Sequence, residues 1–183
     1  MMSDAEGWLV VIDPQAIFAD PATSPWGTPL FTAAVPRIRE LAAAYGDRVV
    51  VTRFVASSAP HGSWVPYYEE FPFALVPDTD PLYAVVPELA DVAASAAADG
   101  RVVTEPTFGK WGAGLRSVVG DLPSLTLAGV ATDCCVLSTA LAAADAGASV
   151  QVSASACAGS SVENHDRALA AMALYAPQIE VVP

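Results

Sequence analysis

Residues 124–136 read Ser-Leu-Thr-Leu-Ala-Gly-Val-Ala-Thr-Asp-Cys-Cys-Val, and they hold both a clear fold signal and two adjacent thiols. The first six residues form a short run that is almost wholly apolar, which predicts a strand buried on both faces. Residues 133–146 are rich in Ala and Leu and predict a helix. A buried strand that runs directly into a helix is typical of a parallel α/β sheet.

The same alternation of short β-branched runs and longer Ala/Leu segments extends along the whole chain. Strands are predicted at residues 8–12, 48–54, 101–104, 124–129, 149–153 and 179–182. Helices are predicted at residues 31–45, in part of 81–98, and at 112–119, 133–146 and 162–175. We therefore predict a three-layer α/β/α sandwich with a mainly parallel six-stranded sheet, formed by one domain over residues 1–183.

Composition limits the classes of function. The 183 residues are 54% hydrophobic and 15% charged, so a packed core is expected. A net charge of −12 repels nucleic acids and anionic membranes, and we expect a small-molecule substrate instead of either partner. No basic, apolar leader or membrane-length apolar run occurs, and three cysteines make no disulfide framework, which favours a cytoplasmic location.

Residues 56–80 break the alternation. They are rich in proline and in aromatic residues, too apolar for a flexible linker, and long ordered loops are usually functional. We predict that this loop is either a lid over a site or an oligomer contact. Together with the Ala-rich helices, it suggests a homodimer or homotetramer.

Reactive side chains gather where predicted strands end. Asp13 follows the first strand, Cys134 and Cys135 follow the fourth, and Lys110 lies shortly after the third. Because ligands bind beyond the carboxyl ends of strands in open parallel sheets, an acid, a thiol and an amine are expected at one edge. Lys110 is the only lysine in the chain, which argues against a role in solubility. Asp13 has an alternative interpretation, because an aspartate before proline often only starts a turn.

The two cysteines are predicted to lie in the first turn of the helix over residues 133–146. Thr132 or Asp133 would cap that helix, and the free amides there would favour the reactive thiolate. Successive helical residues point about 100° apart, so one cysteine at most can face the site. Both could instead be small buried hydrophobic residues, which is common for free cysteine.

The sequence lacks the motifs of metal sites and of nucleotide-binding sites. His61 and His165 are the only histidines, and no His-x-x-x-His or Asp-x-His spacing suggests a metal site. A Cys-His pair would require His61 to fold over the site. Neither glycine-rich phosphate-binding pattern occurs, so we expect neither a metal nor a nucleotide cofactor.

Three motifs of this chain resemble those of one protein family and occur in the same order along the sequence. Asp13-Pro14-Gln15 with Phe18, then Lys110, then residues 129–136 with Thr139-Ala140, are similar to the isochorismatase-like cysteine hydrolases. That family includes nicotinamidases and carbamoylsarcosine amidohydrolase. The Gly-x-x-Thr-Asp-x-Cys-Val segment is specific, and the resemblance spans nearly the whole chain.

The resemblance implies a role for each matching residue. Cys135 and not Cys134 takes the place of the nucleophile, with Asp13 as the acid and Lys110 as the amine of the triad. It also implies a cis peptide between Val130 and Ala131, with the Ala131 and Cys135 amides binding the oxyanion. The implied reaction is hydrolysis of a C–N bond through a thioester, without a cofactor.

Two positions depart from the family. Where nicotinamidases carry an Asp-x-His metal pair after the second strand, this chain has Val51-Thr52-Arg53-Phe54, which disfavours that metal site. Where the family tends to have an acid before Ala-Cys-Ala-Gly, this chain has Ser155. Hydrolysis of an isochorismate-type vinyl ether and a non-catalytic binding role stay open as alternatives.

Candidate substrate contacts come from aromatic residues near the strand ends. Phe18 matches the family's aromatic residue after the first strand, while Trp64, Tyr67 and Trp111 lie on the irregular segments. Each of them could equally belong to the core or to an interface. Walls of this kind suit a small, flat or apolar amide.

Overall fold

The computed structural model describes residues 7–183, so the first six residues of the predicted domain lie outside the described residues. Six parallel strands form one sheet in the order β3-β2-β1-β4-β5-β6. The strands are β1 (Trp8–Ile12), β2 (Val49–Phe54), β3 (Val102–Glu105), β4 (Ser124–Val130), β5 (Ser149–Ala158) and β6 (Ile179–Val182). The predicted α/β class with a six-stranded parallel sheet is confirmed.

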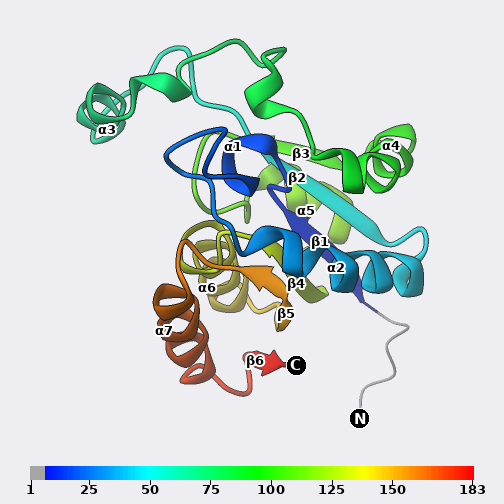
Figure 1. The fold of residues 1–183 in the computed structure, drawn as a ribbon. Coiled ribbons are helices and arrows are strands. Elements are labelled where there is room, and N and C mark those ends of the chain that lie inside the picture. The colour runs from blue at the N-terminus through cyan, green and yellow to red at the C-terminus, as the bar shows by residue number, and fades with distance from the viewer. Residues whose placement is uncertain (1–6) are drawn as a thin grey trace.

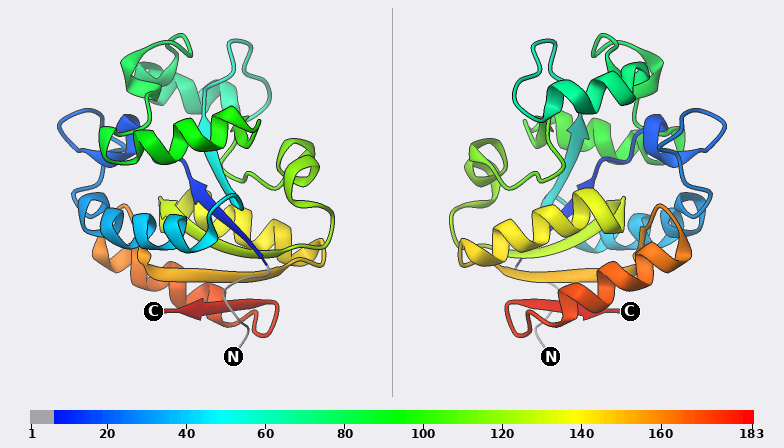
Figure 2. Two further views of the ribbon diagram at one scale, coloured as in Figure 1. Left: turned by 90° about the vertical axis from the view of Figure 1, so that its right-hand side faces the viewer. Right: turned by 90° about the vertical axis from the view of Figure 1, so that its left-hand side faces the viewer.

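Helices cover both faces of this sheet (Figures 1 and 2). The α-helices are α1 (Ala16–Ala19), α2 (Phe31–Tyr45), α3 (Trp64–Glu70), α4 (Ala90–Ala98), α5 (Ala113–Val119), α6 (Leu137–Asp145) and α7 (Val162–Ala173). Three single 3₁₀ turns occur at Pro72–Ala74, Pro81–Tyr83 and Pro87–Leu89. No helix among residues 7–183 is both long and apolar enough to span a membrane.

Alternate residues of the central strand fill two separate cores. Leu9 and Val11 of β1 pack toward α2 and α4 on one face. Val10 and Ile12 pack toward α5, α6 and α7 on the other. All four side chains are completely buried, as expected for an inner strand of a parallel sheet. The sheet is thus the middle layer of three.

The close approach of β1 and β4 explains why residue 129 is a glycine. Gly129 pairs with Ile12 and has a φ of 115°, and a Cβ at that position would lie 2.2 Å from the Ile12 carbonyl oxygen. Only glycine fits such a contact. It brings the ends of β1 and β4, and the residues that follow each, side by side.

The segment over residues 56–80 is not the continuous loop that we predicted. It contains α3 and the 3₁₀ turn at Pro72–Ala74, and Figure 1 shows α3 at the opposite end of the molecule from the chain termini. Pro66 lies in the first turn of α3, where a missing amide proton costs no helical hydrogen bond. Packing of Trp64, Tyr67 and Tyr68 against other aromatic rings stabilises this short helix.

Candidate active site

Asp13 lies at the carboxyl end of β1, and its side chain is completely buried. Its φ of 44° is left-handed, which is uncommon for a residue other than glycine. Thr52 of β2 holds this conformation from both sides. The Asp13 amide donates to Thr52 Oγ1 (3.1 Å), and Thr52 Oγ1 donates to Asp13 Oδ1 (2.6 Å). Thr52 therefore fixes the carboxylate and leaves Oδ2 for other partners.

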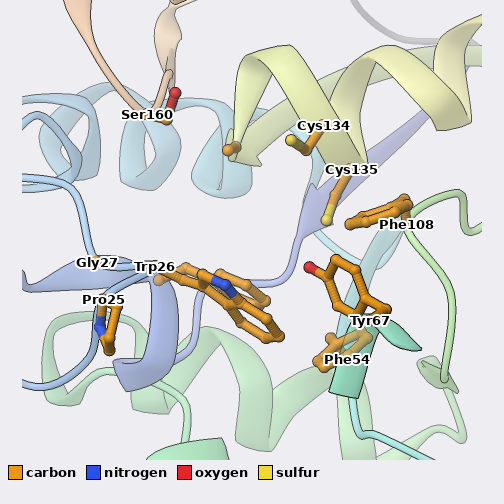
Figure 3. Close-up of a pocket in the computed structure, with 11 residues that line it drawn as sticks. Pro25, Trp26, Gly27, Phe54, Tyr67, Phe108, Cys134, Cys135 and Ser160 are labelled. Atoms are coloured by element: carbon orange, nitrogen blue, oxygen red, sulfur yellow. The ribbon is translucent and has the colours of Figure 1, made fainter. Parts of the chain in front are cut away.

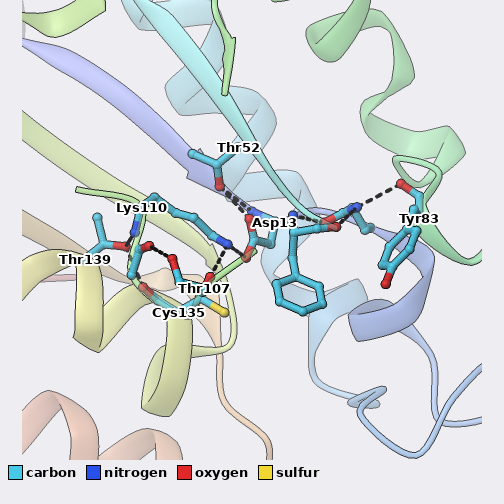
Figure 4. Close-up of polar contacts among 10 residues, drawn as sticks. Asp13, Thr52, Tyr83, Thr107, Lys110, Cys135 and Thr139 are labelled. Atoms are coloured by element: carbon cyan, nitrogen blue, oxygen red, sulfur yellow. Dashed lines mark hydrogen bonds and ion pairs between the residues drawn. The ribbon is translucent and has the colours of Figure 1, made fainter. Parts of the chain in front are cut away.

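Lys110 takes the other oxygen of that carboxylate. Its Nζ lies 3.0 Å from Asp13 Oδ2, and neither side chain is exposed to solvent. Nζ also donates to the Thr107 carbonyl oxygen (2.7 Å) and lies 5.3 Å from the centre of the Phe54 ring. Figure 4 shows the Lys110 contacts with Asp13 and Thr107 beside Cys135. The carboxylate, the carbonyl and the aromatic face thus supply the polar partners that a buried lysine needs in place of water.

Thr139 of α6 joins the lysine segment to the cysteine segment. The Lys110 amide donates to Thr139 Oγ1 (2.9 Å), and Thr139 Oγ1 donates to the Cys135 carbonyl oxygen (2.7 Å). Thr139 is completely buried, so both hydrogen bonds are protected from water. This single hydroxyl therefore sets the spacing between the backbones that carry the amine and the thiol.

The two adjacent cysteines face different surroundings. The peptide between Val130 and Ala131 is cis, and residues Thr132–Val136 then form a single π-helical turn before α6. Within this turn Cys135 is only 3% exposed, whereas Cys134 is exposed. Cys135 is therefore the buried thiol of the two, but both cysteines line the pocket described below, so the expectation that one at most would face the site is wrong.

The predicted capping of this helix is wrong. Ala131 occupies the N-cap position, and neither Thr132 nor Asp133 caps the turn with its side chain. Thr132 Oγ1 instead shares a hydrogen bond with His165 Nδ1 (2.8 Å). Asp133 accepts hydrogen bonds from the Ser160 amide (2.8 Å) and hydroxyl (2.7 Å). These contacts anchor the turn to the start of α7, which a sequence reading restricted to the helix itself overlooks.

The resting state of Cys135 also differs from the expected thiolate. Burial raises the pKa of the Cys135 thiol well above its ordinary value, and the negative charge of Asp13 raises it further, against the opposing effect of the Lys110 ammonium. The free thiol therefore keeps its proton at neutral pH. Because Asp13 is the adjacent base, transfer of this proton to Asp13 would create the nucleophile when substrate is bound.

Cys135 opens into a pocket of about 190 Å³ whose lining is mostly apolar (Figure 3). Its wall consists of Phe18, Pro25, Trp26, Gly27, Phe54, Tyr67, Phe108, Ala131, Cys134, Cys135 and Ser160. No residue of this wall carries a formally charged side chain. Such a wall suits an uncharged, apolar ligand, since a buried charge without a partner is costly.

The whole described fold matches one family. The family model described as the isochorismatase domain matches residues 7–181. The chain belongs to the isochorismatase family. This confirms the resemblance seen in the sequence, and the match covers far more than half of the chain.

Solved structures of this fold are similar over nearly the full length. A cysteine hydrolase from Pseudomonas syringae pv. phaseolicola 1448A has a TM-score of 0.79 at 18% identity, covering 98% of this chain and 89% of that chain. A pyrazinamidase/nicotinamidase from Streptococcus mutans UA159 has a TM-score of 0.70 at 24% identity, covering 97% of this chain and 99% of that one. A search of curated proteins found no match. At these identities, the neighbours establish the fold of this isochorismatase-family chain and no finer property.

Two of the four predicted substrate contacts line the pocket. Phe18 and Tyr67 belong to its wall, whereas Trp64 and Trp111 do not. Trp64 packs behind Tyr67 and against Phe108, and Trp111 packs against the core that also contains Cys135. Those two tryptophans therefore have structural roles in place of the predicted contact. His61 is exposed and lies outside the wall, so it forms no pair with Cys135.

Trp26, Phe54 and Phe108 are the aromatic pocket residues that the sequence did not suggest. Trp26 contacts the rings of Phe18 and Phe54 on the sheet side, and of Tyr67, Phe71 and Phe73 on the α3 side. It lies in an irregular segment with no strand or helix pattern to place it. Phe54 could have been suggested, because it ends β2 at the same edge as Asp13.

The segment at the end of β2 has no metal-binding character in this member of the family. Thr52 hydrogen bonds to Asp13, and Phe54 contributes its ring to the pocket. Among the described residues, no group of three or more His, Cys, Asp or Glu side chains could hold a metal ion. Both positions therefore serve the acid and the pocket wall.

Proposed function

We propose that this protein is a cysteine hydrolase that cleaves the C–N bond of a small, uncharged amide. Cys135 is the nucleophile, Asp13 the general acid and base, and Lys110 the cation that holds them. The observation that carries this proposal is the completely buried ion pair between Asp13 and Lys110 beside a buried thiol that opens into a pocket. A purely structural ion pair has no need of an adjacent thiol, and buried pairs add little net stability.

The reaction begins when Asp13 accepts the proton of the Cys135 thiol. The sulfur then attacks the amide carbonyl carbon, and the electron pair of the C=O bond moves onto the oxygen. The amides of Ala131 and Cys135 would bind this oxyanion, and Ala131 lines the pocket beside Cys135, which supports that role.

Collapse of this intermediate breaks the C–N bond. Asp13 returns the proton to the leaving nitrogen, and ammonia or an amine departs while the acyl group stays on Cys135 as a thioester. Asp13 then takes a proton from water, and the resulting hydroxide attacks the thioester. The acid product leaves, and the proton returns to the Cys135 sulfur.

The two alternatives receive less support from the site. Isochorismate is a dicarboxylate, and the pocket wall offers no cationic side chain to bind carboxylates. A non-catalytic binding protein would not need an acid, an amine and a thiol together at one strand edge. Similarity to a pyrazinamidase/nicotinamidase agrees with amide hydrolysis, although that name describes the other protein.

An ammonia-release screen over a panel of small amides tests the proposal. Wild-type protein and Cys134→Ala should release ammonia from at least one uncharged amide, and Cys135→Ala should release none. Cys134 is a matched control, because it is the adjacent thiol on the same turn. Ammonia release by Cys135→Ala at the wild-type rate would refute the proposed nucleophile.

Location and assembly are separate proposals. The free cysteines support a cytoplasmic location. The aromatic segment around α3 supports a homodimer or homotetramer. Size-exclusion chromatography with light scattering measures the assembly directly.

A further inference from the structure

Tyr67 extends a hydroxyl group from α3 into the pocket. Figure 3 shows the Tyr67 oxygen pointing from the α3 side toward the Cys135 sulfur, across the space between Trp26 and Phe108. No hydrogen bond joins this oxygen to any of the residues that the structure describes. The pocket wall therefore contains a strong hydrogen-bonding group that the protein itself leaves unused.

The ring of Tyr67 is held so that the direction of its hydroxyl is fixed. Its centroid lies 5.7 Å from that of Phe108 with the planes at 90°, and 5.8 Å from that of Trp26. Trp64 and Phe71 pack on it at 5.2 and 5.0 Å. Only rotation of the O–H bond stays free, so binding a ligand at this oxygen would cost little further side-chain entropy.

The hydroxyl stays a donor throughout the working pH range. Burial raises the pKa of Tyr67, and the nearby thiols of Cys134 and Cys135 raise it further when ionised. A neutral phenol donates its proton more strongly than its oxygen accepts one. It therefore suits a ligand atom that carries a lone pair.

Apart from the indole N–H of Trp26, the other polar side chains of the wall are already occupied or weak. The Ser160 hydroxyl donates to Asp133 and accepts from Asn164. Thiols are weak hydrogen-bonding groups. A buried acceptor on a ligand would consequently find a strong side-chain donor at Tyr67, on the α3 side of the described wall, or at the indole N–H of Trp26.

We propose that the Tyr67 hydroxyl determines specificity by donating a hydrogen bond to a neutral acceptor on the acyl group of the substrate. The substrate class is then an uncharged amide whose acyl group carries a ring nitrogen, an ether oxygen or a carbonyl oxygen within an otherwise apolar frame. This inference rests on the proposed function, since that function assigns the other parts of the amide. In that mechanism the carbonyl oxygen of the substrate binds the Ala131 and Cys135 amides, and its departing nitrogen faces Asp13. The rest of the acyl group is then the part that can contact Tyr67.

Aldehyde analogues test this without a known substrate. The Cys135 sulfur adds to an aldehyde carbon, and the thiol proton passes to the oxygen, which gives a reversible thiohemiacetal. Benzaldehyde has no ring acceptor, whereas the 2-, 3- and 4-pyridinecarbaldehydes have the same shape with one ring nitrogen. Dissociation constants are measured as protection of Cys135 from iodoacetamide, with the labelled peptide quantified by mass spectrometry.

Tyr67→Phe removes the hydroxyl and keeps the ring. Tyr68→Phe is the matched control, because Tyr68 is adjacent on α3, is buried, has an unpartnered hydroxyl and does not line the pocket. For at least one pyridine isomer, Tyr67→Phe should reduce the preference over benzaldehyde by about fivefold or more, and Tyr68→Phe should not change it. Differences in aldehyde reactivity cancel, because the same aldehydes are compared on each variant.

Each other outcome overturns the inference in a recognisable way. If all four aldehydes protect Cys135 but Tyr67→Phe leaves every preference unchanged, the specificity role is refuted and the proposed nucleophile stands. If Tyr67→Phe weakens benzaldehyde and the pyridines equally, Tyr67 acts on the thiol or on packing. If no aldehyde protects Cys135 in the wild-type protein, both the proposed function and this inference are refuted.

Discussion

The Lys110 ammonium lies 3.0 Å from the Asp13 carboxylate, and both side chains are completely buried. Asp13 Oδ2 accepts no further hydrogen bond among the described residues, whereas Oδ1 is held by Thr52. One oxygen thus positions the acid, and the other keeps a lone pair for proton transfer. The charges of the pair act in opposite directions on the neighbouring Cys135 thiol, which gives the first two predictions their signs.

Asp13→Asn should separate thiol reactivity from catalysis. Since the negative charge of Asp13 raises the pKa of the Cys135 thiol, its loss should lower that pKa and increase the thiolate fraction at pH 7.5. Iodoacetamide should then label Cys135 faster, while amide hydrolysis falls by about 10² to 10⁴ because no group moves the proton. Slower labelling, with the fold intact by circular dichroism, would contradict the assigned electrostatics.

Lys110→Met should change labelling in the opposite direction. The Lys110 cation lowers the pKa of the Cys135 thiol, so its removal should raise that pKa and slow labelling at every pH below 9. Leaving Asp13 buried without its partner should also cost about 3–5 kcal/mol of unfolding free energy. Labelling rates and urea melts measure the two effects separately. If this variant and Asp13→Asn shift labelling in the same direction, the opposing roles are wrong.

Thr139→Val should destabilise the protein and lower its activity together. The variant keeps the shape of the side chain but leaves the buried Lys110 amide without an acceptor and the Cys135 carbonyl without its Thr139 donor. A loss of about 1–3 kcal/mol in unfolding free energy is expected by urea denaturation. Thr139→Ser restores the hydroxyl and should recover most of the activity. If the Val and Ser variants are equally active, the bridge does not set the site geometry.

Stability should fall at alkaline pH in part through Cys157. Burial raises the pKa of this thiol to about 12, whereas an unfolded cysteine has a pKa of about 8.5. The folded state therefore holds the proton more tightly, and the resulting stabilisation is present below pH 8.5 and lost as the pH rises toward 12. By pH 10 the loss should reach about 2 kcal/mol.

Urea melts of wild-type protein and Cys157→Ala at pH 7 and pH 10 measure this loss. The substitution leaves a small cavity and lowers stability at both pH values, so the relevant quantity is the difference between them. That difference should be smaller in the variant. An identical fall in both proteins would show that other groups cause it.

Trp26→Ala should loosen α3 from the rest of the pocket. Trp26 contacts Phe18 and Phe54 on one side and Tyr67, Phe71 and Phe73 on the other, so its ring joins the two walls. Limited proteolysis should cut faster within residues 56–80, and KM should rise more than kcat falls. Trp64→Phe serves as a comparison, since Trp64 is the first residue of α3 and does not line the pocket. If Trp26→Ala is cut no faster than the wild-type protein, Trp26 does not join the two walls.

The sequence predicts the sheet well because its strands are unbroken apolar runs. The bounds of β1 and β6 agree with the prediction. β5 continues to Ala158, five residues beyond its predicted end, because Ser153 and Ser155 interrupt the apolar pattern while the ladder to β4 resumes after a bulge. α3 was missed because Pro66 and the surrounding aromatic residues resemble a loop, and tertiary packing decides their structure.

The sequence predicted the reactive residues of the candidate site better than the residues that surround them. Asp13, Lys110 and Cys135 come together because strand ends meet at one edge of a parallel sheet, which is a rule of topology. The roles of Thr52 and Thr139 depend on contacts between residues distant in sequence, and no local pattern indicates them. The pKa of Cys135 depends on how deeply the thiol is buried, which a helical turn considered alone cannot give.

The most direct test is the acylation state of Cys135 during turnover of an amide that the ammonia screen identifies. The reaction is quenched in acid within the first turnovers, and digested peptides are analysed by mass spectrometry. The proposed mechanism predicts an acyl group on Cys135, none on Cys134, and its loss when hydroxylamine is added before the quench. Continued ammonia release with no acyl group on Cys135, or with one on Cys134, would contradict the mechanism.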